Sequence, residues 1–106
     1  MGASSHSNKN ELSNETSILL KFTRGAEKRR RILEIIKLAP RNCNQIAEEL
    51  KADWWSIQKH LQRLERADLA KVVNLGHTRF YNITPKGLLA IDLLTSDSEN
   101  AHSHAQ

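Results

Sequence analysis

The sequence is poor in cysteine and has no long apolar run, and each shortage excludes a class of protein. Cys43 is the single cysteine, so the chain forms no internal disulfide and fits a reducing compartment. No apolar run approaches the roughly 20 residues that span a bilayer. The N-terminus also lacks the charged-then-apolar order of a signal peptide. We therefore expect a cytoplasmic protein that does not associate with a membrane.

Motifs for catalysis and cofactor binding are also missing. The sequence contains no glycine-rich loop that could cradle a phosphate and no spaced cluster of histidine, cysteine and carboxylate residues. His102 and His104 have a weakly metal-like spacing in the polar C-terminal tail, and we expect them to be inert. The sequence therefore predicts a protein that is not an enzyme, with no cofactor and no bound metal.

Positive charge is concentrated in the middle of the chain. The 106 residues suffice for one small domain with tails, and the net charge is +4. Residues 24–86 contain 14 Lys or Arg against 7 Asp or Glu, a balance of +7, so the flanks total −3. A basic folded region favours a nucleic acid or another acidic partner, although charge alone is weak evidence.

The stretch 53–66 carries the clearest pattern. Ile57, Leu61 and Leu64 form one apolar stripe at helical spacing, and Asp53 stands at the N-cap position. The opposite face has cations, amides, a hydroxyl and an indole, but no carboxylate. A helix with one apolar face for the core and an opposite face that lacks carboxylates is suited to bind a polyanion. This pattern predicts a DNA recognition helix.

Two helices are predicted before it. Residues 27–39 have apolar residues at helical spacing and end at Pro40. An extended link at 41–43 follows, and Asn44 is expected to cap a helix over 45–51. Only Lys51 and Ala52 then precede the Asp53 cap. Two helices joined by so short a connection, the second amphipathic, indicate a helix-turn-helix.

A hairpin and a last helix are predicted after it. Residues 70–75 and 78–83 are rich in β-branched and aromatic residues and are separated by Gly76 and His77. Thr84 and Pro85 then begin a helix expected to end near Leu94. A short extra helix is predicted at 12–22, and disorder at 1–11 and 95–106. One domain therefore spans 12–94.

Residues 45–72 and 80–87 carry a resemblance to a known group. The stretches QIAEELKADWWSIQKHLQRLERADLAKV and FYNITPKG resemble winged-helix transcription regulators of the ArsR-like class, archaeal members in particular. The resemblance covers about residues 27–94. It implies a mainly α fold with a small hairpin, in the order helix, short strand, helix, helix, two-strand wing, helix. Asp68 replaces the usual glycine, and the Cys-x-Cys metal motif is missing, so metal sensing is not implied.

The predicted DNA-binding residues come from three places: the start of the second helix, the outer face of 53–66, and the hairpin tip. Lys59 and Gln62 are expected to reach bases, and Arg66 to meet phosphate. The predicted set is Asn44, Gln45, Trp55, Ser56, Gln58, Lys59, Gln62, Arg63, Arg66, His77, Thr78 and Arg79.

The two tryptophans, His60 and the basic run 28–31 are interpreted separately. Trp54 lies near the apolar stripe and is assigned to packing in the turn, whereas Trp55 lies far from it and is assigned to DNA. His60 flanks the stripe and is expected at a helix interface. The basic run 28–31 is either a solvated face or a contact with the DNA backbone.

The sequence thus predicts a sequence-specific regulator of double-stranded DNA that acts as a homodimer. Its recognition helix would be 53–66 and its wing 75–79, and two protomers would read half-sites about 34 Å apart. Two alternatives remain open at this point. One is a winged helix used for protein–protein contact, and the other is a non-specific nucleoid or RNA binder.

Overall fold

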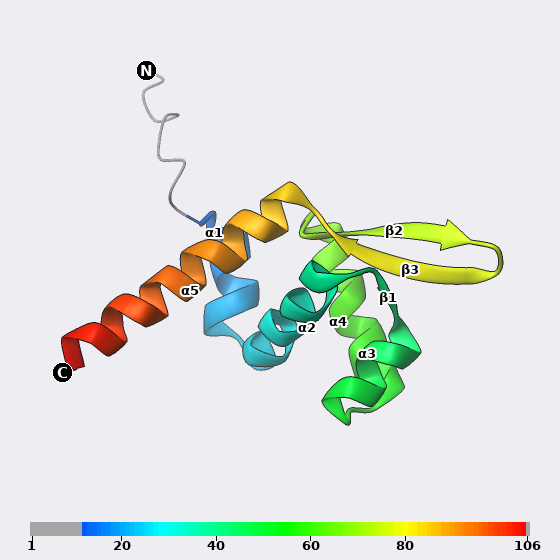
Figure 1. Cartoon of the computed structure of the whole chain (residues 1–106), viewed down its shortest axis with the longest axis horizontal. Helices are drawn as coiled ribbons and strands as arrows, with labels where there is room; N and C mark the ends of the chain where they lie inside the picture. The colour runs from blue at the N-terminus through cyan, green and yellow to red at the C-terminus, as the bar shows by residue number, and fades with distance from the viewer. Residues whose placement is uncertain (1–11, 106) are drawn as a thin grey trace, which may run out of the picture.

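The computed structural model describes residues 12–105, with side chains described as far as Ser96. The disorder predicted at 1–11 lies outside these residues. The elements follow the predicted order (Figure 1): α1 Asn14–Ser17, the π-helix η2 Ile18–Phe22, α2 Ala26–Leu38, β1 Arg41–Asn42, α3 Cys43–Leu50, α4 Trp54–Arg66, β2 Ala70–Leu75, β3 Thr78–Ile83 and α5 Pro85–Ala105.

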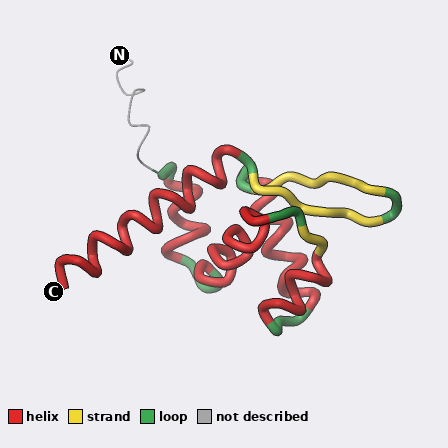
Figure 2. The backbone as a smooth tube through the Cα atoms, in the orientation of Figure 1, coloured by secondary structure: helices red, strands yellow, loops and turns green. Residues whose placement is uncertain are grey.

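The three strands form one antiparallel sheet in the order β1-β3-β2. Tyr81 lies in the middle of it, opposite Arg41 on one side and Val72 on the other. The β2–β3 hairpin turns at Gly76, whose φ of 65° is left-handed. Figures 1 and 2 show this hairpin projecting from the helical body on the side opposite to α5. Helix-turn-helix followed by a projecting hairpin is the winged-helix arrangement, as predicted.

The hydrophobic core lies where α2, α3 and α4 meet the sheet. The apolar stripe of α4 is fully buried, as predicted, and Tyr81 of β3 is 1% exposed. Burying one such side chain contributes about 1.5–3 kcal/mol relative to leaving it exposed. The most deeply buried aliphatic side chains are Leu20, Ile32, Leu33, Ile46, Ile57, Leu61, Leu64, Leu69 and Ile91.

The two helices of the helix-turn-helix are capped at their first turns. The Asp53 carboxylate accepts from the Ser56 backbone N–H at 3.0 Å, as predicted. The predicted Asn44 cap of α3 is wrong, because Asn42 occupies that position. Asn42 accepts from the Gln45 N–H at 2.8 Å while the Gln45 side chain accepts from the Asn42 N–H at 2.9 Å. This reciprocal capping box satisfies two backbone donors and so fixes the start of α3.

The last helix begins where predicted and ends later. Thr84 accepts from the Gly87 N–H at 3.0 Å, and Pro85 is the first residue of α5. The helix continues to Ala105, so the predicted end near Leu94 is too early. The reason is local, because no glycine or proline follows Gly87 to stop the helix. The disorder predicted for 95–106 stays a prediction.

The segment 12–25 packs against the winged-helix domain. Ser13 caps α1 by accepting from the Thr16 N–H at 3.1 Å, which confirms the helix predicted there. Leu20 is fully buried in the common core. The Leu20 carbonyl accepts from the Arg30 guanidinium at 2.6 Å, so the segment is held both by apolar contact and by charge-assisted hydrogen bonds.

Gly25 joins this segment to α2, and we expect Gly25→Ala to destabilise the protein. Its φ is 87°, and an added Cβ would lie 2.8 Å from His60 Cε1. The strain of a left-handed alanine and the overpacking against His60 together predict that the free energy of unfolding falls by about 3 kcal/mol. Gly76→Ala is the matched control, since its φ is 65° and an added Cβ would meet nothing within 4 Å. Urea unfolding of both variants measures the difference, and equal losses would show that the approach to His60 does not constrain the chain.

Candidate nucleic-acid interface

The outer face of α4 is exposed and, from Trp55 through Lys59 and Gln62 to Arg66, carries no carboxylate, while the inner stripe is buried in the core. The exposed Glu65 lies on the flank that also carries Gln58. Trp55 is 68% exposed. Lys59, Gln62, Arg63 and Arg66 are also exposed. Ser56 is half-buried in the first turn, where its N–H is already used by the Asp53 cap. The face predicted from the helical wheel is therefore present on the folded surface.

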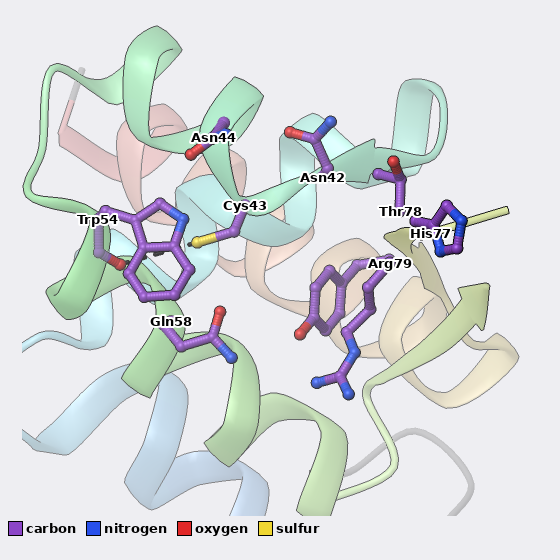
Figure 3. Close-up of a pocket in the computed structure, with 9 residues that line it drawn as sticks. Asn42, Cys43, Asn44, Trp54, Gln58, His77, Thr78 and Arg79 are labelled. Atoms are coloured by element: carbon purple, nitrogen blue, oxygen red, sulfur yellow. Dashed lines mark hydrogen bonds between the residues drawn. The ribbon is translucent and has the colours of Figure 1, made fainter. Parts of the chain in front are cut away.

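A groove of about 420 Å³ lies between the starts of α3 and α4 and strand β3. Figure 3 shows Trp54 and Gln58 of α4 across from Thr78 and Arg79 of the wing. No Asp or Glu lines it. Five predicted residues meet there, together with four that the sequence did not indicate as a site. The full lining is Asn42, Cys43, Asn44, Trp54, Gln58, His77, Thr78, Arg79 and Tyr81.

The predicted packing of Trp54 in the turn is wrong. Trp54 is 40% exposed and lines the groove. Its ring stands edge-on to that of Trp55, with centroids 5.0 Å apart and planes at 90°. The Trp54 carbonyl accepts from the Cys43 thiol at 3.7 Å. Trp54 is the first residue of α4 and lies at the edge of the apolar stripe. At that edge its side chain faces the groove and not the core.

Not all predicted residues lie near the groove. Arg63 and Arg66, in the second half of α4, line a separate depression of about 290 Å³ with Glu15, Ile18 and Leu19. They therefore belong to the side of α4 that faces the N-terminal segment. Gln45 is exposed beside the groove, but its side-chain oxygen is already used in the α3 capping box.

Arg29 is fully buried, which the solvated-face reading of the basic run did not anticipate. Its Nε donates to the Leu19 carbonyl at 2.8 Å, and one terminal nitrogen donates to the Thr23 hydroxyl and to the Arg24 carbonyl at 3.3 Å. The other terminal nitrogen donates to His60 Nδ1 of α4 at 3.1 Å. The sequence did contain a signal of this burial. Arg29 precedes Ile32, Leu33 and Ile36 at the spacing of one buried helical face.

His60 lies at the interface between α4 and the N-terminal segment, as predicted. Burial, followed by the positive charges of Arg29, Arg63 and Lys28, lowers the pKa of His60 to about 4. The imidazole is therefore neutral at pH 7 and accepts from Arg29 through Nδ1. Burial also lowers the pKa of Arg29, with a smaller effect from Arg63, but a guanidinium remains protonated under these conditions.

No protein-family model matches the sequence, and no curated protein matches it significantly. Solved structures do match. A possible transcriptional regulator for arsenical resistance is 23% identical with a TM-score of 0.60, over 81% of this chain and 84% of that one. A mutant of S. aureus MepR bound to an oligodeoxyribonucleotide is 16% identical with a TM-score of 0.71, over 87% and 69%. Streptococcus pneumoniae FabT in complex with DNA is 20% identical with a TM-score of 0.64, over 84% and 67%.

These similarities establish the fold of the chain. At such identities they show the winged-helix architecture of transcriptional regulators and nothing finer. None of the three proteins is described as an enzyme. Within the described part of the chain, no helix is long and apolar enough to cross a membrane.

The His60–Arg29 contact predicts a loss of stability in mild acid. The His60 imidazole has its ordinary pKa of 6.5 in the unfolded chain but a pKa of about 4 in the folded chain. The free energy of unfolding is therefore at its full value above pH 6.5 and falls as the pH drops toward 4. At about 1.4 kcal/mol per pKa unit the loss is roughly 3 kcal/mol. His60→Asn keeps an acceptor for Arg29 but cannot titrate. Urea unfolding at pH 7, 5.5 and 4.5 should show a smaller loss for this variant, and parallel losses would contradict the assignment.

Proposed function

We propose that this protein is a sequence-specific regulator that binds double-stranded DNA through α4 and the wing. The observation that carries the proposal is that the outer face of α4 and the lining of the adjoining groove both lack carboxylates. The exposed face of α4 borders the groove, and the groove reaches the wing through Thr78 and Arg79. A duplex presents a polyanion of matching shape, since its major groove admits one helix while adjacent backbone remains within reach of a hairpin.

Base contacts are assigned to the exposed middle of α4. Lys59 and Gln62 lie one turn apart and point away from the buried stripe. Lysine can donate to both acceptors of guanine, and glutamine can pair bidentately with adenine. Trp55, which is 68% exposed, offers an apolar surface for a thymine methyl group or a sugar. These three side chains would provide the sequence readout.

Backbone contacts are assigned to the surfaces on either side. Asn44 lies in the first turn of α3, where helical N–H groups favour phosphate. On the wing, Arg79 supplies a cation, with His77 and Thr78 beside it. Arg63 and Arg66 would meet a phosphate further along the duplex. Such contacts fix the register of the protein on DNA without reading its sequence.

A homodimer is part of the proposal, with α5 as its contact. Leu88 and Leu89 on this helix are 41% and 45% exposed. Figure 1 shows α5 projecting away from the wing, so a second copy seated there would leave both DNA-binding surfaces free. One small domain contacts few bases, and two symmetry-related domains double that number.

The finer classification rests on the sequence motifs. Ile46-Ala47, Ser56-Ile57 and His60-Leu61 follow the pattern of ArsR-like regulators, and residues 80–87 follow an archaeal variant. The left-handed Asp68, with φ of 64°, adopts the conformation that the usual glycine of the pattern would provide. We therefore propose that the protein belongs to this class, as a cytoplasmic, non-enzymatic regulator whose DNA-binding domain spans 12–94.

A mobility-shift experiment with fragmented genomic DNA tests the proposal. We expect a subset of fragments to remain bound in excess unrelated competitor DNA. Equal binding of all fragments, or of RNA, would instead indicate a non-specific nucleic-acid binder. Absence of any shift at low salt would favour a protein partner for the same face.

Lys59→Ala should weaken binding to a selected fragment about ten-fold, because one base contact contributes about 1–3 kcal/mol of discrimination. Lys37→Ala removes the same charge from the exposed last turn of α2 and serves as the control, with an expected change below two-fold. Fluorescence anisotropy at fixed salt measures both. Equal effects of the two variants would mean that α4 contributes only net charge.

Leu89→Lys should convert the dimer to a monomer, because a charged side chain would be buried at the α5 contact. Leu38→Lys, at a leucine that is 79% exposed at the end of α2, is the matched control and should leave the dimer intact. Sedimentation equilibrium gives the mass of each variant. A dimer that survives Leu89→Lys places its contact elsewhere.

A further inference from the structure

Among the described residues, one buried side-chain oxygen has no hydrogen-bond partner, and it belongs to a residue of the groove. The Tyr81 side chain is 1% exposed, and among the described residues its hydroxyl is the buried side-chain group with no partner. Leaving such a group unpaired costs about 1–3 kcal/mol. By contrast, the buried Thr84 hydroxyl donates to the Asp68 carbonyl at 2.6 Å and accepts from Gly87.

The position of Tyr81 is fixed by the sheet. It lies on the central strand, paired with Arg41 of β1 and Val72 of β2. Its ring is packed in the hydrophobic core while the residue also lines the groove. A hydroxyl held by a rigid strand binds a partner without the loss of side-chain entropy that a long flexible side chain incurs.

The surroundings of this hydroxyl favour an acceptor that carries negative charge. No carboxylate lines the groove, Arg79 contributes a cation, and Asn44 and Thr78 contribute neutral donors. The side chain of Gln58, half-buried on α4, borders the same space. The hydroxyl itself is buried, so contact with a ligand requires a side-chain rearrangement in the groove, which is the scale of adjustment that interfaces commonly make on binding.

We propose that the Tyr81 hydroxyl donates a hydrogen bond to a phosphate oxygen of the DNA backbone, seated in the groove between α4 and the wing. This inference rests on the proposed function and assigns the groove a definite occupant. Phosphodiester oxygens are acceptors with negative charge, and half to two-thirds of protein–DNA hydrogen bonds go to phosphate and sugar. A base edge fits less well, because it presents donors as well as acceptors.

Tyr81→Phe separates this role from a structural one. The variant removes a hydroxyl that has no partner in the free protein, so its melting temperature should equal or exceed that of the wild type. Affinity for a selected duplex should fall about ten-fold, the typical effect of a hydrogen bond to a charged group. The fold-loss of affinity should be the same for a random duplex, because a phosphate contact does not depend on the base sequence. Thr84→Val, which removes two hydrogen bonds, should lower the melting temperature.

Several results would overturn the inference. If Tyr81→Phe binds DNA as tightly as the wild type, the hydroxyl does not contact the duplex, although the proposed function would stand. A loss confined to the selected sequence would point to a base contact instead. A lower melting temperature would mean that the hydroxyl has a partner within the protein. Failure of the wild type itself to bind any duplex would refute the proposed function separately.

A neutral phosphate analogue locates the contact. Single methylphosphonates are placed in turn along the selected duplex, and one position should weaken the wild type but not Tyr81→Phe. Tyr81 is the only tyrosine, so 3-fluorotyrosine gives one ¹⁹F signal, which should shift with the intact duplex and not with that analogue. Inorganic phosphate alone should leave the signal in place. A shift with phosphate alone would assign the groove to a free anion, and additive losses at every position would contradict the contact.

Discussion

The structure depends on a buried cation, Arg29, whose partners among the described residues include no carboxylate. Arg29 is fully enclosed, and its guanidinium is satisfied by two carbonyls, a hydroxyl and the neutral His60. An unpaired buried charge would be costly, so every one of these acceptors has to remain in place. The carbonyls and the hydroxyl come from the N-terminal segment, whereas His60 comes from α4. One side chain therefore helps to set where α4 lies relative to the rest of the domain.

This constraint divides α4 into surfaces with separate tasks. The stripe of Ile57, Leu61 and Leu64 is sealed in the core, and His60 ties one flank to Arg29. The outer face remains free, and the opposite flank borders the groove through Trp54 and Gln58. Because α4 is held on two sides, the side chains of its third side can bind a partner with little further loss of conformational entropy. The proposed DNA contact uses that third side, with the groove extending it to the wing.

Local patterns predicted much of the fold, and long-range packing accounts for what they missed. The Asp53 cap and the stripe of α4 depend on neighbours within one or two turns, so the sequence was sufficient. Asn42 and Asn44 both suit a cap, and Gln45 three residues after Asn42 was the signal that separates them. The burial of Arg29 and the exposure of Trp54 depend on η2 and on β3, which are distant in the sequence. The groove and its Tyr81 hydroxyl exist only once β3 pairs with β1.

Together these features support our proposal that the outer face of α4 and the wing read a DNA sequence as a symmetric pair. Selection of bound duplexes from a random pool tests it most directly, because enrichment and symmetry are scored together. The account predicts an enriched inverted repeat whose half-site centres lie about 10 base pairs apart, one turn of the duplex. A pool that remains random after repeated rounds, while the protein still binds it, would contradict the account.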